Sequence, residues 1–392
     1  MVAAVRAGHS QRWVAHQFGV SLSTVQFWVQ RAQDKALDQV DWSDLSHAPH
    51  QQAKQTPEEW EQRILALREE LMRNSDLGEY GAQAIRQNLL EQADLCPEQV
   101  PSVPTINRIL RRHGVFDAKR RVRRPAPMPG WYLPEVAAKK AEIDETDGVE
   151  GLLLEGGPEV YVLNLISLHG GFCASWPTLS VTAAFTCSCL LWHWRSWGLP
   201  DYAQFDNAPA FAGPHKYADT IGSVIRLCLS LKVTPVFAVP REFGIQSSIE
   251  SYNNRWQQKV WQRYHFASLE ALVAQSSRYV EAVRKKRLPR QEMAPTRRAF
   301  PANWQEALSL ERDGRIIYLR RTSDTGHVDL LGHSYAVDAH WTNRLVRCEV
   351  DLSTDCIRVF GLRRQAPTEQ HLLKEFAYRL PDRSQKKSTN VG

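Results

Sequence analysis

The segment PVFAVPREFGIQSSIESYNNRWQQKVW, residues 235–261, decides how this chain folds. An apolar strand runs into a loop that contains Gly244 and two serines, and a helix follows. One stripe of that helix is apolar at helical spacing and should pack on a sheet. The stripe consists of Ile249, Tyr252, Trp256 and Val260. A strand, a loop and a packed helix indicate an α/β domain.

Glu250 lies one turn into this helix, at the margin of the apolar stripe. A surface glutamate near a helix N-terminus interacts favourably with the helix dipole, which is the simplest interpretation. However, the i+4 position is Asn254 rather than Lys or Arg, so a helical salt bridge does not explain Glu250. A functional role depends on whether other carboxylates can meet it.

Two aspartates upstream end predicted strands: Asp144 in EIDET and Asp206 in YAQFDN. Sites in α/β sheets are built at strand ends, although an aspartate after a strand is often only a turn residue. Together with Glu250, these carboxylates would form an open site of hard oxygen ligands, suited to Mg²⁺ or Mn²⁺.

The first and the third residue of this triad each have an alternative. Asp147 could replace Asp144, but Gly148 predicts a turn there, so Asp144 is preferred. Glu242 could replace Glu250, but it precedes the helix and has no apolar stripe to fix its direction.

The pattern around this segment predicts a multidomain chain of the α + α/β + β class. Over residues 139–288, strands come first and then alternate with helices, which indicates an α/β core with a mixed sheet. Short strands separated by turn residues predict a small β-barrel over 310–365. A polar tail is expected over 366–392.

Residues 1–37 contain two short helical stretches separated by Gly19, with Ser21 or Ser23 as the cap of the second. This pattern is typical of a helix-turn-helix unit, whose second helix enters the major groove; an ordinary helical hairpin is the alternative. The residues expected to contact DNA there are Ser23, Thr24, Gln26 and Gln30.

A second unit of this kind is predicted over 56–116, with a helix capped at Thr56 and a short helix from Thr105 to Arg112. A basic, proline-containing linker, 117–138, follows and could track a phosphate backbone. The DNA-contacting residues expected here are Arg108, Arg111, Arg112, Lys119, Arg120, Arg121, Arg123 and Arg124. Gln246, Asn254 and Gln257 are expected to lie along DNA at the core.

Composition limits the class of protein. The 392 residues are 43% hydrophobic and 23% charged, with a net charge of +6 and no uncharged apolar run long enough to span a membrane. Seven cysteines without a CxxC motif argue against disulfides and zinc, and residues 1–13 lack the apolar core and cleavage site of a signal peptide, so a cytoplasmic, DNA-associated protein is expected. Basic runs at 119–124 and 284–290 favour a polyanionic partner.

In these residues the chain resembles the DDE transposases and integrases of the retroviral-integrase superfamily, particularly bacterial insertion-sequence transposases with N-terminal helix-turn-helix domains. Pro240, Gln246 and Glu250 fall on the proline, glutamine and catalytic glutamate of the integrase motif. FDN falls on the second aspartate and EID on the first. The resemblance covers roughly residues 10–287.

The resemblance implies a ribonuclease H-like core in which Asp144, Asp206 and Glu250 hold two Mg²⁺ or Mn²⁺ ions. It also implies phosphodiester hydrolysis at the element ends followed by strand transfer into target DNA, carried out by a multimer on double-stranded DNA. Two alternatives remain: a nuclease of the same fold that lacks strand transfer, and a DNA-binding regulator with an inactive integrase-like domain.

Overall fold

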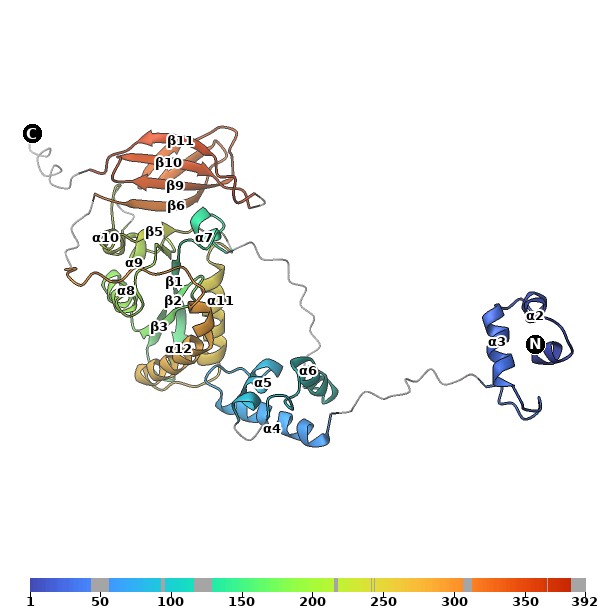
Figure 1. Cartoon of the computed structure of the whole chain (residues 1–392). Helices are drawn as coiled ribbons and strands as arrows, with labels where there is room; N and C mark the ends of the chain where they lie inside the picture. Colours follow the sequence, from blue (N-terminus) through green and yellow to red (C-terminus); the bar gives the residue numbers. More distant parts are fainter. Residues whose placement is uncertain are drawn as a thin grey trace, which may run out of the picture. The chain divides into compact units, whose positions relative to one another are not determined.

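The computed structural model divides the chain into two compact units, Met1–Trp60 and Glu61–Gly392. Figure 1 shows the helices and strands in each. The described residues are 1–43, 56–92, 96–115, 129–214, 218–240, 242, 244–305, 312–364 and 366–381.

The described part of the N-terminal unit is helical. It contains α1 (Val2–Arg6), α2 (Gln11–Gln17) and α3 (Leu22–Arg31). Ser21 caps α3, because its side chain accepts the backbone N–H of Thr24. Gly19, in the turn before it, has a φ of 62°, which favours glycine. Val14 and Val25 are fully buried where α2 packs on α3.

Helix α4 (Glu58–Asn74) runs across the division between the units, and α5 (Ala82–Glu91) and α6 (Val103–Arg112) follow in the second. Helix α6 begins before the predicted Thr105, because Ser102 is its cap and accepts the N–H of Thr105. Pro104 fits in the first turn, where a backbone N–H has no partner within the helix.

The predicted mixed α/β sheet is confirmed. β1 (Ile143–Leu153), β2 (Glu159–Ser167) and β3 (Cys173–Thr178) are antiparallel, and β4 (Tyr202–Phe205) and β5 (Thr234–Phe237) add in parallel beside β1. The helices around them are α7 (Pro134–Ala137), α8 (Ala183–Trp197), α9 (Pro209–Ala212), α10 (Ser223–Ser230), α11 (Ser247–Trp256), which continues as the π-helix η1 (Gln257–Trp261), and α12 (Leu269–Gln291).

The C-terminal strands continue the same sheet, so the separate β-barrel expected over 310–365 is not what they form. Among the described residues, nine strands follow the order β11-β10-β9-β6-β5-β4-β1-β2-β3. The added strands are β6 (Arg315–Arg321), β9 (Leu345–Asp351), β10 (Cys356–Gly361) and β11 (Leu372–Ala377). β7 (His327–Leu330) and β8 (His333–Ala336) form a separate hairpin.

The C-terminal strands join the α/β core through a short parallel pairing of β5 with β6. In this pairing Val236 is opposite Ile317, and Phe237 is opposite Tyr318. β11 lies inside 366–392, so part of the expected tail belongs to the sheet. Short apolar strands read alike in a barrel and at the end of a sheet, because both present buried faces at period two.

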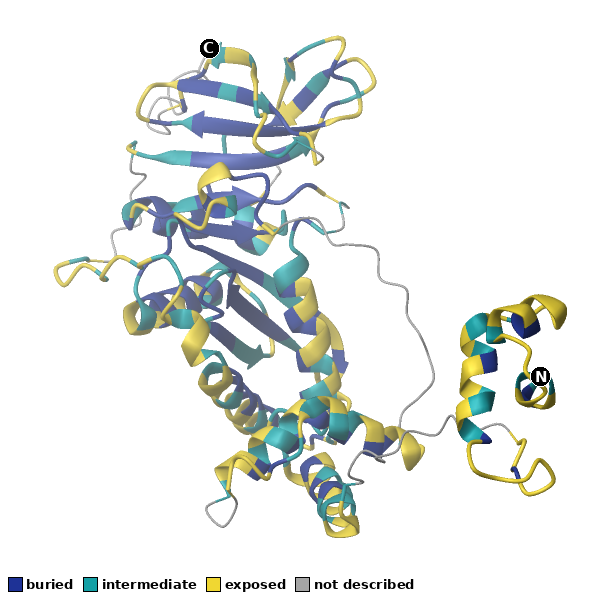
Figure 2. Cartoon of the chain, turned by 45° about the vertical axis from the view of Figure 1, so that its right-hand side comes forward, coloured by how far each residue is buried: buried dark blue, intermediate teal, exposed yellow. Residues whose placement is uncertain are grey.

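Two sets of helices cover the two faces of the part of the sheet formed by β1–β5 (Figure 1). α8 and α10 pack on one face with Phe205 and Phe237, whereas α11 and α12 pack on the other with Val149 and Val162. The central strands are accordingly buried, and the helices expose their outer sides (Figure 2). None of the described helices has the length and apolar character that a membrane crossing requires.

Candidate active site

Two aspartates lie level with each other where β4 ends beside the middle of β1. In the pairing of β1 with β4, Glu145 is opposite Gln204. Two residues further along each strand are Asp147 and Asp206. Since alternate residues share a face, this register puts Asp147 and Asp206 side by side on one face of the sheet, where β4 ends.

Asp144 lies on the other face of β1, because it is an odd number of residues from Asp147. Its side chain is fully buried. Arg297 donates to both carboxylate oxygens, at 2.8 and 2.7 Å, and Trp194 Nε1 donates at 3.0 Å. Burial acts to raise the pKa of Asp144, but the Arg297 guanidinium outweighs it, and the pKa is lowered. Asp144 is therefore an ionised, enclosed partner of Arg297.

This placement conflicts with the expected role of Asp144 as an open metal ligand. The reason for rejecting Asp147 also fails, since Gly148 does not form a turn but continues β1, opposite Leu163. Asp147 thus projects from a strand, on the same face as Asp206, and replaces Asp144 as the first aspartate of the candidate site.

Asp147 is held by helix α11 and faces two further carboxylates. Asn253 Nδ2 donates to Asp147 Oδ2 at 2.8 Å, and Asn253 Oδ1 accepts from Asn164 at 2.8 Å. Burial, followed by the negative charges of Asp206 and Glu250, raises the pKa of Asp147 to about 6. Asp206 and Glu250 therefore both lie within electrostatic reach of Asp147.

Glu250 is exposed in the first turn of α11. The start of this helix is fixed to β1, because Glu145 Oε2 accepts the N–H of Ile249 at 2.8 Å. Glu145 is 1% exposed, and burial, together with the charge of Glu250, raises its pKa to about 8. A buried carboxyl on the Asp147 face of β1 thus positions the helix that carries Glu250.

Asp206 is both a turn residue and a member of the cluster. Its Oδ1 accepts the N–H of Ala208 at 2.8 Å, which shapes the turn after β4. Burial raises its pKa, and the charge of Glu150 adds to the effect. The side chain remains partly exposed.

The cluster of Asp147, Asp206 and Glu250 suits a hard divalent cation. Carboxylate oxygens are the ligands that Mg²⁺ and Mn²⁺ prefer, and a cation would relieve the repulsion that raises the pKa of Asp147. Among the described residues, no group of three or more His, Cys, Asp or Glu side chains could hold a metal ion as it stands. The three carboxylates would therefore have to move closer together to bind one ion.

The residues expected to read DNA bases lie in α3. Gln26 and Gln30 are exposed, as is Ser23, and Thr24 is partly exposed. Ser21 Oγ lies 2.8 Å from both the Ser23 and the Thr24 hydroxyl oxygens. These two hydroxyls therefore also support the helix cap, and Gln26 and Gln30 are the less constrained candidates.

The arginines of α6 differ in their surroundings. Arg108 and Arg111 are exposed, whereas Arg112 pairs with Glu61 at 2.9 Å, so part of its charge is balanced within the protein. The expected backbone-tracking run of Lys119, Arg120, Arg121, Arg123 and Arg124 lies outside the described residues.

The three amides expected along DNA at the core also differ. Asn254 is exposed and accepts from Gln258 Nε2 at 2.9 Å. Gln257 is partly exposed at the start of η1. Gln246 Nε2 is buried without a hydrogen-bond partner among the described residues, so this amide points inward.

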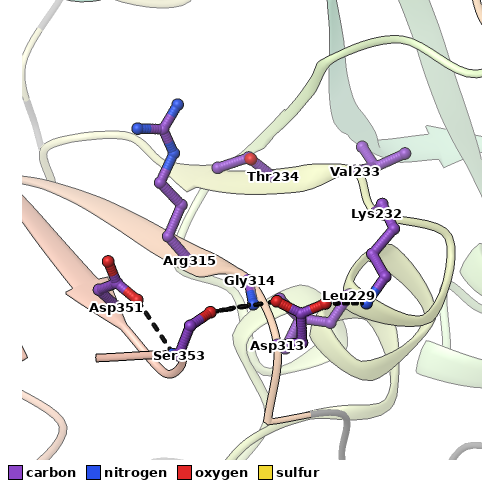
Figure 3. A pocket seen from close by; sticks show the side chains of 9 residues that line it. All are labelled: Leu229, Lys232, Val233, Thr234, Asp313, Gly314, Arg315, Asp351 and Ser353. Carbon is purple, nitrogen blue, oxygen red and sulfur yellow. Dashed lines mark hydrogen bonds and ion pairs between the residues drawn. The ribbon is translucent and has the colours of Figure 1, made fainter. Parts of the chain in front are cut away.

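A pocket of about 270 Å³ lies at the opposite end of the parallel strands (Figure 3). Thr234 and Arg315, which start β5 and β6, line it. Asp313 there accepts from Lys232 at 2.6 Å and from Ser353 at 3.1 Å. Because Asp206 follows the end of β4, this pocket is separate from the carboxylate cluster.

Sequence reasoning missed several residues that support the site. Asn253 had a usable signal, because it lies three residues after Glu250 on the same side of the helix. Glu145 also had one, since it alternates with Asp147 along β1. Arg297 had none, because its pairing with Asp144 depends on the folded chain.

No protein-family model and no curated protein matches the chain. Among solved structures, it is similar to the simian T-cell lymphotropic virus intasome in complex with the PP2A regulatory subunit B56 gamma. The identity is 12% and the TM-score 0.33, over 68% of this chain and 84% of that one.

Two integrase catalytic cores are similar as well. The catalytic core domain of BIV integrase matches at 15% identity and a TM-score of 0.26, over 34% of this chain and 79% of that one. The HTLV-2 integrase catalytic core in complex with magnesium matches at 13% identity and a TM-score of 0.25, over 42% of this chain and 86% of that one.

Proposed function

We propose that this chain is a DNA transposase or integrase whose chemistry is carried out by Asp147, Asp206 and Glu250. The observation that carries the proposal is the shared position of these carboxylates. It is supported by the β1–β4 register, in which Glu145 and Gln204, two residues before Asp147 and Asp206, are opposite each other, and by the charges of Asp206 and Glu250 that act on Asp147.

These three side chains would hold Mg²⁺ or Mn²⁺, two ions in the active form. When bound, the ions would lower the pKa of water and stabilise the charge that develops on phosphate oxygens. The chain itself supplies position: Asn253 orients Asp147, and Glu145 anchors the start of the Glu250 helix.

The substrate in this proposal is double-stranded DNA. One site would serve two successive in-line displacements at phosphorus. In the first, water cleaves a phosphodiester at the element end and leaves a 3′-hydroxyl. In the second, that hydroxyl attacks a phosphodiester of target DNA, and one new bond forms as one breaks. Joining two ends requires that copies of the chain assemble on DNA, so a homo-multimer is part of the proposal.

The test is an assay of end cleavage and strand transfer. Oligonucleotides covering the DNA on both sides of the gene would serve as donors, with plasmid as target, and with Mg²⁺, Mn²⁺ or EDTA. We expect products only with a divalent ion. Asp147→Asn, Asp206→Asn and Glu250→Gln should each lower both steps by at least about a hundredfold, because removing one ligand weakens the site that both steps share.

The outcomes separate the competing functions. Cleavage without strand transfer would indicate a nuclease of the same fold. Specific binding of flanking DNA without either reaction would indicate a DNA-binding regulator. Retention of activity in Asp147→Asn, with loss in a folded Asp144→Asn variant, would return the first ligand position to Asp144.

A further inference from the structure

Two loops bring carboxylates of the candidate site into place, and both contact the C-terminal strands. The first loop follows β4 and carries Asp206 and Asn207. The second follows β5, includes Glu242 and leads into α11, which carries Glu250. Figure 1 shows β6, β9, β10 and β11 continuing the sheet beyond β5.

Arg320, on β6, ties down the first loop. Its Nη2 donates to Asn207 Oδ1 at 2.9 Å, and its Nη1 approaches Ala238 O at 3.4 Å. Asn207 Nδ2 in turn donates to Ala238 O at 2.7 Å. The residue directly after Asp206 is therefore bonded to the ends of both β5 and β6.

Arg321 and Arg364 tie down the second loop through Glu242. Arg321 Nη2 donates to Glu242 Oε2 at 2.6 Å, and Arg364 Nη2 donates to Oε1 at 2.5 Å. The Glu242 side chain is only 18% exposed, although the two arginines are 45% and 40% exposed. Each oxygen of this carboxylate thus has its own guanidinium, which holds the loop from the next strand and from the segment after β10.

An apolar contact strengthens the same attachment. Ile245, which lies between Glu242 and α11, is 2% exposed. It belongs to a buried cluster with Leu319, Leu345 and Leu362 of the C-terminal part. The loop before the Glu250 helix is therefore held on both its charged and its apolar side.

We propose that the C-terminal strands are a positioning element of the carboxylate site: Arg320 fixes the loop of Asp206, and Arg321 and Arg364 fix, through Glu242, the loop that leads to Glu250. Glu242 acts here as an anchor and not as a metal ligand. The kinetic part of this proposal rests on the proposed function, whereas the conformational part does not.

The first measurement is hydrogen–deuterium exchange of the 242–252 segment in the full chain without metal or DNA. Glu242→Gln should raise the exchange rate roughly fivefold, because one partly buried ion-pair anchor is lost. The Arg321→Gln, Arg364→Gln double variant should do the same, and combining it with Glu242→Gln should add little. Glu242→Asp keeps the charge and should restore much of the protection.

Glu375→Gln is the matched control. It removes the same charge from an ion pair in the same part of the sheet, with Arg358 at 2.8 Å, but touches neither loop. Its exchange in the 242–252 segment should equal that of the parent.

The second measurement is the Mg²⁺ dependence of DNA cleavage. Glu242→Gln should raise the Mg²⁺ concentration for half-maximal rate by about three- to tenfold, because the helix that carries a ligand is less well positioned. The rate at saturating Mg²⁺ should stay close to that of the parent, unlike the rate of Glu250→Gln. Arg320→Lys should shift the same midpoint through the Asp206 loop.

Unchanged exchange in Glu242→Gln and in the double arginine variant would overturn the anchor. So would a loss of rate in Glu242→Gln that Mg²⁺ cannot restore, since that result would make Glu242 a ligand. If the parent cleaves no DNA, the proposed function fails, and the exchange data still decide whether the C-terminal strands hold the loop.

Discussion

Asp144 and Asp147 lie three residues apart on one strand, and strand alternation gives them opposite surroundings. Asp144 faces α8 and pairs with Arg297 in a closed interior. Asp147 faces α11 and the carboxylates of Asp206 and Glu250. Two aspartates of similar sequence context therefore differ in what their loss would do to the protein.

Asp144→Asn should destabilise the fold. It removes the charge that compensates Arg297, whose side chain is only 5% exposed, and breaking a buried pair on one side costs about 3–5 kcal/mol. Urea unfolding followed by circular dichroism would measure the loss. Asp147→Asn should show no such loss without metal, because it removes mutual repulsion at the cluster. Equal stability of Asp144→Asn and the parent would contradict the buried pairing.

His193 lies on the same face of the sheet as Asp144 and should make the stability of the fold depend on pH. It is fully buried, both ring nitrogens lack a hydrogen-bond partner among the described residues, and burial lowers its pKa to about 3. Below pH 6.5 the unfolded chain takes up this proton and the folded chain does not, so stability falls as the pH falls from about 6.5 toward 3, by at most about 1.4 kcal/mol per pH unit.

Replacing His193 with Leu should remove this component. The variant should be more resistant than the parent to unfolding at pH 4–5, measured by thermal denaturation across pH 4 to 8. His16→Leu, at an exposed position of α2, is the control. A parallel pH profile in His193→Leu and the parent would show that another group controls acid unfolding.

At the level of single residues, the candidate site keeps Asp206 and Glu250 of the predicted triad and replaces Asp144 with Asp147. Asp206 and Glu250 could be predicted as candidates because each adjoins a segment with a clear period. The sequence favours Asp144 over Asp147 because Gly148 predicts a turn, whereas pairing with Leu163 keeps Gly148 in β1. Arg297 and Arg320 could not be found, since both act through contacts that exist only after folding.

At the level of elements, we expect the exposed side chains of α3 and of α6 to make different kinds of contact with DNA. Gln26 and Gln30 are exposed amides that can contact base edges, whereas Arg108 and Arg111 are exposed charges that can contact phosphates. Arg112 differs from these arginines because Glu61 already balances it.

Gln26→Ala should therefore weaken binding to flanking DNA while leaving binding to random DNA unchanged. Arg111→Gln should weaken both and lower the slope of log K against log salt by about 1. Arg112→Gln should have a smaller effect on that slope. Fluorescence anisotropy at several salt concentrations would measure these terms, and equal effects of all three variants would contradict this division of roles.

Most elements of the α/β core were predictable, because their apolar residues recur at periods that only a helix or a strand satisfies. The start of α6 was misplaced by two residues, since Ser102 is a better cap than Thr105 with Pro104 between them. The π-helix η1 could not be predicted, because α11 and η1 form one uninterrupted periodic segment in the sequence.

At the level of the whole molecule, the shared sheet predicts that the C-terminal part cannot be removed as a module. Ending the chain before β6 would expose the β5 edge and the apolar side chains Phe237 and Ile245. We expect a chain that ends at residue 305 to be insoluble or unfolded by circular dichroism. A soluble, cooperatively unfolding fragment would contradict the continuous sheet.

The parallel pairing of β5 with β6 also bears on how the chain is made. During synthesis, β5 leaves the ribosome before α11, η1 and α12, and its partner β6 comes only after all three. Until then the growing polypeptide carries an apolar strand with one unpaired edge, which can pair with the same edge of a neighbouring nascent chain or accept its β6. Non-local parallel pairs also form slowly. From this order of elements we expect dependence on chaperones and strand exchange between copies during synthesis.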